Sequence, residues 1–150
     1  IKKIYYKYLL FVIICKNQYP MNNIPFSFDQ RLDNEFLLSI YEGDAEHACM
    51  VFTQFIDMSP GLIRDIDESF TLGVVEPLRS KVHKLKPVFS FVGLTNLTKN
   101  AEVLEKKCKE TSDINDIKGL YNELKNNYYQ YFPIIEKELE RLKKQINQEV

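Results

Sequence analysis

The feature that most constrains the fold is an amphipathic stripe in residues 75–92. Apolar side chains recur there at alternating steps of three and four residues, as they do on the buried face of an α-helix. The stripe consists of Val75, Leu78, Val82, Leu85, Phe89 and Val92. At about 100° per residue, His83 falls about 130° from the centre of the stripe, so its imidazole is predicted to point at water. The residues that share the histidine face are Arg79, Ser80, Lys86, Pro87 and Ser90.

The rest of the chain also reads as helix. Glycine is scarce, and no run of alternating Val, Ile and Thr indicates a strand. We expect a short helix over about 32–41 that is stopped by Gly43, and then a longer one that Asp44 caps. Ser59 and Pro60 predict a break and restart of that longer helix, which reaches about residue 69. Together with a turn at residues 71–73, these signals place the histidine helix third.

Three further boundaries complete the predicted architecture. The histidine helix should start near Val75 and end at Gly93. Thr95 or Asn96 should cap the next helix, which runs to about residue 110 and is followed by a loop over 111–116. The last helix should span about 116–148, with an interruption and a kink at Pro133. The sum is an all-α, antiparallel four-helix bundle of up-down-up-down topology, with a short extra N-terminal helix.

Composition narrows the class of protein. The 150 residues are enough for one domain with a core, and 45% of them are hydrophobic and 27% charged, as in an ordinary globular protein. A net charge of −1 gives no global field that favours nucleic acid or an anionic membrane. Three unevenly spaced cysteines form no disulfide framework, which favours a reducing compartment, and we expect a cytoplasmic location.

The first 27 residues are interpreted as an N-terminal arm, and residues 28–150 as the helical bundle. The apolar run Leu9–Cys15 is too short for a membrane span, and no signal-peptide cleavage site follows it. Because the first methionine is Met21, we interpret residues 1–20 as sequence that is not native, and the remaining arm as disordered. A membrane-tethering tail is the alternative. Phe26 and Phe28 are expected to pack on the bundle.

A family resemblance rests on the residues around the histidine. The run His83-Lys84-Leu85-Lys86 is followed by Gly93, ten residues past the histidine, and then by Leu97 and the pair Leu104-Glu105. This arrangement resembles the histidine-containing phosphotransfer (HPt) domain family, whose pattern is H-x-L-K-G with a later glycine, a leucine and a Leu-Glu pair. The match covers roughly thirty residues closely. Pro87 departs from it, because the family usually has glycine four residues after the histidine.

The resemblance implies a function. In this family the histidine takes a phosphoryl group from a receiver-domain aspartate and passes it to another receiver, in a multistep two-component phosphorelay. It implies His83 as phosphoacceptor and Lys86 as the cation that stabilises the phosphoryl group. Arg79, Ser80, Pro87 and Ser90 would form the partner-binding surface. The chain would be a phosphoryl carrier without kinase activity of its own.

The resemblance also implies the partners. These are response-regulator receiver domains, either of separate proteins or of a hybrid sensor histidine kinase from which this chain is a fragment. No cofactor is expected on the chain itself, since Mg²⁺ belongs to the receiver, and no nucleic acid or membrane partner is expected. We expect a monomer. The alternative is a helical adaptor that binds a partner through the His83 face without phosphotransfer, because proline at position 87 puts the local geometry in doubt.

Other chemistry finds little support in the sequence. His47 and Cys49 lack companions at metal-ligand spacing. No nucleophile elbow and no glycine-rich phosphate loop is present. The aromatic residues Phe52, Phe55 and Phe89 are interpreted as core, whereas Phe91 is expected to face either a neighbouring helix or the partner.

Overall fold

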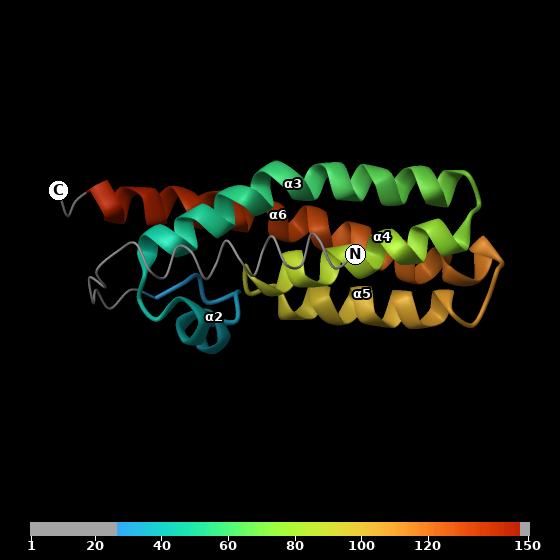
Figure 1. Cartoon of the computed structure of the whole chain (residues 1–150), viewed down its shortest axis with the longest axis horizontal. Helices are drawn as coiled ribbons and strands as arrows, with labels where there is room; N and C mark the ends of the chain where they lie inside the picture. Colours follow the sequence, from blue (N-terminus) through green and yellow to red (C-terminus); the bar gives the residue numbers. More distant parts are fainter. Residues whose placement is uncertain (1–26, 148–150) are drawn as a thin grey trace.

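The computed structural model describes residues 27–147, and within them it contains helices and no strand. Four long helices run antiparallel along the molecule, and a short helix lies at the end where α4 connects to α5 (Figure 1). The elements are α2 (Asn34–Tyr41), α3 (Ala45–Thr71), α4 (Val75–Ser90), α5 (Thr95–Cys108), the 3₁₀ helix η1 (Ile114–Ile117) and α6 (Lys118–Asn147). The predicted all-α four-helix bundle with an extra N-terminal helix is confirmed.

The apolar stripe predicted for α4 packs into the bundle core and thereby fixes the orientation of the helix that carries the histidine. All six of its members are buried, with exposed fractions between 0 and 6%. Phe52, Phe55 and Phe89 are buried as well, as expected for core residues. Because this stripe fixes the rotation of α4, the opposite face of the helix is left to solvent.

The prolines do not divide the helices as expected. α3 runs without interruption through Pro60, so the predicted break at Ser59 is wrong. Ser59 is fully buried, and its hydroxyl lies 2.9 Å from that of Tyr128 on α6. The proline removes one backbone hydrogen bond, while burial of side chains on both sides of it stabilises the continuous helix. α6 is likewise a single helix through Pro133.

The N-cap residue was predicted correctly for α3 but not for α5. Asp44 caps α3 as predicted, by accepting a hydrogen bond from the backbone N–H of His47. For α5, however, the residue at the cap position is Leu94, and neither Thr95 nor Asn96 caps the helix. The hydroxyl of Thr95 instead donates a hydrogen bond to the carboxylate of Asp33, at 2.7 Å.

The ends of two helices differ from prediction by a few residues. α4 ends at Ser90, and the chain then turns through Gly93, whose φ of +73° favours glycine. α5 ends at Cys108 instead of about residue 110, and the expected loop after it contains η1. Phe28 is buried, as expected, whereas the expectations for residues 1–20 and for Phe26 lie outside the described residues. No helix within residues 27–147 is both long and apolar enough to cross a membrane.

Candidate functional site

His83 lies in the middle of α4 on the face opposite the core. Its side chain is 48% exposed, so the predicted outward orientation is confirmed. Val82 on one side of it is fully buried, which anchors the backbone that carries the imidazole. The histidine is therefore accessible on a rigid part of the bundle.

The partner of His83 is Glu105, which α5 contributes from across the helix interface. Its carboxylate is 7% exposed, and its Oε1 lies 3.1 Å from Nδ1 of His83. Its other oxygen, Oε2, lies 2.6 Å from Nζ of Lys86, one turn after the histidine. One carboxylate thus joins the two residues of α4 that the sequence marks as functional.

The charge state of Glu105 fixes the role of each imidazole nitrogen. Burial raises the pKa of Glu105, but hydrogen bonds from Lys86 and His83 outweigh burial and lower this pKa from 4.5 to about 2. Glu105 is consequently an ionised acceptor at neutral pH, with no proton to donate. The contact therefore requires Nδ1 of His83 to carry the proton, and in the neutral ring it leaves the lone pair on Nε2.

Two further cations surround the same carboxylate. Nζ of Lys109, one turn after Glu105, lies 3.6 Å from Oε1, and Nη1 of Arg79 lies 3.8 Å from it. We call Arg79, His83, Lys86, Glu105 and Lys109 the Glu105 cluster. Because one buried negative charge faces three permanent positive charges, the cluster can attract an additional anion at its exposed edge.

Arg79 is less available to a partner than the sequence suggested. Its guanidinium makes a two-point contact with Glu76, with Nε 2.8 Å from Oε2 and Nη2 2.5 Å from Oε1. This carboxylate raises the pKa of Arg79 and holds its guanidinium in an ion pair within its own helix. In the described part of the chain, Lys86 and Lys109 are thus the lysines of the cluster whose carboxylate contact is with Glu105, whereas Arg79 is shared with Glu76.

The other predicted partner-binding residues surround the histidine on α4. Ser80, Pro87 and Ser90 are half-buried, and α4 continues through Pro87. The ring nitrogen of Pro87 carries no hydrogen, so it cannot donate to the carbonyl of His83 four residues earlier. Access to the imidazole nevertheless survives, as the exposure of His83 shows.

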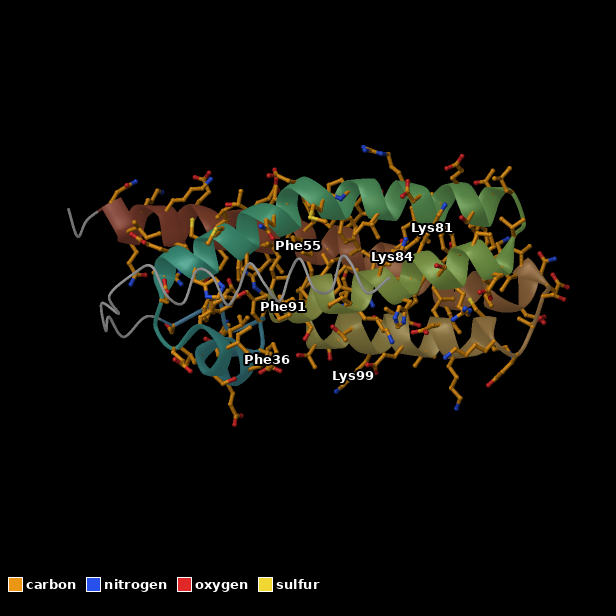
Figure 2. The ribbon with its side chains drawn as sticks, viewed as in Figure 1. Phe36, Phe55, Lys81, Lys84, Phe91 and Lys99 are labelled. Atoms are coloured by element: carbon orange, nitrogen blue, oxygen red, sulfur yellow. The ribbon has the colours of Figure 1, made fainter. Side chains whose placement is uncertain are left out.

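Phe91 belongs to the bundle end and not to the histidine face. Its ring packs partly buried against the core, and in the view of Figure 2 it lies between Phe55 of α3 and Phe36 of α2. Its backbone carbonyl accepts a hydrogen bond from the Tyr41 hydroxyl at 2.6 Å. Of the two expectations for Phe91, packing against neighbouring helices is the one that holds.

A metal centre finds no support in the part of the chain that the structure describes. Within residues 27–147, no three His, Cys, Asp or Glu side chains come together in a way that could hold an ion. His47 is buried and packs edge-on against Tyr41, with ring centroids 5.2 Å apart. It is therefore part of the bundle interior.

Sequence reasoning did not assign a role to Glu105 or Lys109. Glu105 follows Leu104 directly on a helix whose apolar residues Leu97, Ala101 and Cys108 face the core, which places it at the edge of the buried face. An acidic residue at that edge was the available signal. Its pairing with a histidine 22 positions earlier depends on how α4 and α5 are set against each other.

One comparison with known proteins bears on this site. The family described as Hpt domain matches residues 50–148, a stretch that contains most of α3 and all of α4, α5 and α6. The match includes every residue of the Glu105 cluster. No curated protein and no solved structure gives a significant match to the chain.

Proposed function

Because this chain belongs to the Hpt domain family, we propose that it relays phosphoryl groups between receiver-domain aspartates in a multistep phosphorelay, with His83 as the phosphoacceptor. The observation that carries the proposal is an exposed imidazole whose Nδ1 contacts the Glu105 carboxylate, which leaves the lone pair of Nε2 to act as the nucleophile. Receiver domains are the partners that Hpt domains imply. The free thiols of Cys49 and Cys108 suit a reducing compartment such as the cytoplasm.

The proposed transfer needs few groups from this chain. The lone pair on Nε2 attacks the phosphorus of an aspartyl phosphate, the P–O bond to the aspartate breaks, and the aspartate leaves as a carboxylate. The ring becomes positively charged because Nδ1 keeps its proton, and the Glu105 carboxylate at 3.1 Å stabilises that charge. Transfer to the next receiver is the reverse step, in which the ring leaves as a neutral imidazole. Mg²⁺ is supplied by the receiver.

Lys86 is the proposed stabiliser of the phosphoryl oxygens. Its ammonium is 2.6 Å from Glu105 in the resting site, and its side chain is 24% exposed. An ammonium has three hydrogens to donate, so Lys86 can keep its bond to Glu105 while it also donates to a phosphoryl oxygen. Lys109, 59% exposed at the edge of the cluster, adds positive charge toward the same position.

The proposed docking surface is the exposed face of α4 around His83. Ser80, Pro87 and Ser90 are compact, which lets the receiver's own backbone approach the imidazole. Arg79 is held by Glu76, so we assign it to the rim of this surface, where charge affects the rate of association more than affinity. We propose that the chain binds the receiver as a monomer, which a mass from light scattering would check.

The proposal is tested with a purified receiver domain that carries labelled phosphoryl on its aspartate, in the presence of Mg²⁺. We expect label to move to this chain, to be lost in acid, and to be absent in His83→Gln. The alternative function, an adaptor that binds through the His83 face, is kept open by Pro87, which removes a backbone donor next to the histidine. Binding of the receiver without any transfer of label would replace the relay with the adaptor.

A further inference from the structure

The segment that precedes α3 is hydrogen-bonded to the turn between α4 and α5. We call residues 28–41 the N-terminal cap. The backbone N–H of Asp33 donates to the carbonyl of Gly93 at 2.9 Å, and the Thr95 hydroxyl donates to Oδ2 of Asp33 at 2.7 Å. The bond from Tyr41 to the Phe91 carbonyl is a third attachment. Three hydrogen bonds therefore tie the cap to Phe91, Gly93 and Thr95, in the segment 91–95 that leads from α4 into α5.

The cap also packs closely against the turn at Gly93. Leu37 is fully buried, and a Cβ added to Gly93 would lie 2.7 Å from its Cδ1. That distance is shorter than carbon atoms tolerate, so the cap is seated directly on the backbone of the turn. The ring of Phe28 stacks on Phe52 of α3 at 5.8 Å, which anchors the cap to the bundle. The cap thus links α3 to the start of α5.

The start of α5 determines where Glu105 lies. Thr95 is the first residue of α5, and Glu105 follows ten residues, or about 15 Å, later on the same continuous helix. Because backbone hydrogen bonds fix the rise per residue of a continuous helix, we expect a displacement of Thr95 along the helix axis to shift Glu105 in the same direction. The Nδ1–Oε1 distance of 3.1 Å is already long, and an increase of about 0.5 Å would end the hydrogen bond. The bond from Lys86, at 2.6 Å, tolerates the same displacement better.

We propose that Asp33 is a positioning residue for the phosphotransfer histidine. Its carboxylate holds Thr95 through Oδ2 while its Oδ1 caps α2 by accepting from the N–H of Phe36. It thereby sets the register of α5 against α4, and the register lets Glu105 hold Nδ1 of His83. The cap lies outside residues 50–148, so this control comes from a part of the chain beyond the family match. The catalytic meaning of the inference rests on the proposed function.

The test removes the Asp33–Thr95 bond with Thr95→Val, which keeps the shape of the side chain. Thr98→Val is the matched control, because within residues 27–147 the Thr98 hydroxyl bonds only the Leu94 carbonyl of its own helix turn, at 3.2 Å. Thr95→Ser restores a hydroxyl. The readout is the ratio of the two neutral tautomers of His83, measured by ¹⁵N NMR of the imidazole in the intact chain. We expect Thr95→Val to lower the Nδ1–H to Nε2–H ratio about three- to tenfold, the worth of one hydrogen bond, and Thr95→Ser and Thr98→Val to keep it.

The outcome separates this inference from the proposed function. A Thr95→Val ratio equal to that of the unaltered chain, or an equal fall in Thr98→Val, overturns the positioning role. If Thr95→Val does not fold, Thr95→Ala, which also removes the hydroxyl that donates to Asp33 and adds no methyl group beside the carboxylate, carries the test with the same expected direction. The tautomer ratio is measured without any receiver. Absence of phosphotransfer in the unaltered chain would therefore refute the relay and leave the positioning role to be decided by NMR.

Discussion

Replacing Glu105 with glutamine tests the electrostatic centre of the site. The substitution keeps the shape of the side chain and removes the charge that Lys86, His83, Lys109 and Arg79 share. Lowering the pKa of Glu105 from 4.5 to about 2 corresponds to about 3 kcal/mol of interaction in the folded state. Because water reaches His83 and Lys109 and screens part of it, we expect Glu105→Gln to lower the free energy of unfolding by about 1–3 kcal/mol at pH 7.

The direction of the pKa shift determines how this loss of stability depends on pH. The pKa of Glu105 is lower in the folded than in the unfolded chain, so its stabilisation is complete above pH 4.5 and is lost as the pH falls toward 2. Urea unfolding of the unaltered chain and of Glu105→Gln should therefore differ at pH 7 and converge over that range. Glu102→Gln, at an exposed position of α5, is the control and should change little. Equal stabilities at pH 7, or a difference that does not shrink in acid, would refute the reasoning.

Two further substitutions have direct structural expectations. Lys86→Met should slow phosphotransfer to this chain about tenfold, because a charge-assisted hydrogen bond to the phosphoryl group is lost. Lys84→Met, at an exposed residue of α4, is the control and should leave the measured transfer rate within about twofold of that of the unaltered chain. Gly93→Ala should lower the free energy of unfolding by about 1–3 kcal/mol more than Gly73→Ala does in urea titrations, since both positions have positive φ but only Gly93 is covered by Leu37. An equal loss in the two glycine variants would show that Leu37 moves aside.

The sequence was sufficient for what depends on one helix at a time. The stripe from Val75 to Val92 predicted which face of α4 is buried. It therefore also predicted that His83 points outward, with Lys86 one turn later on the same face. The prolines were misjudged because local rules count the lost backbone bond and not the burial around it. Next to Pro60, Ser59 of α3 is buried in contact with Tyr128 of α6, and this contact between helices is not visible to local rules.

What the sequence could not supply was the relation between helices. Glu105 meets His83 across 22 residues, and Asp33 meets Thr95 across 62. Periodicity gives the rotation of each helix about its own axis, but not the translation of one helix along another, on which such pairs depend. For the same reason Thr95 was expected to cap its own helix, when its hydroxyl instead bonds a residue on a distant segment.

The most direct test of the central claim is to locate the phosphoryl group on the phosphorylated chain. ¹⁵N-labelled protein is phosphorylated by a receiver domain, and the nitrogen bonded to phosphorus is identified by NMR. Since Glu105 holds Nδ1 of His83 at 3.1 Å, the account predicts phosphorus on Nε2 of His83. Phosphorus on Nδ1, or on any other residue, would contradict it.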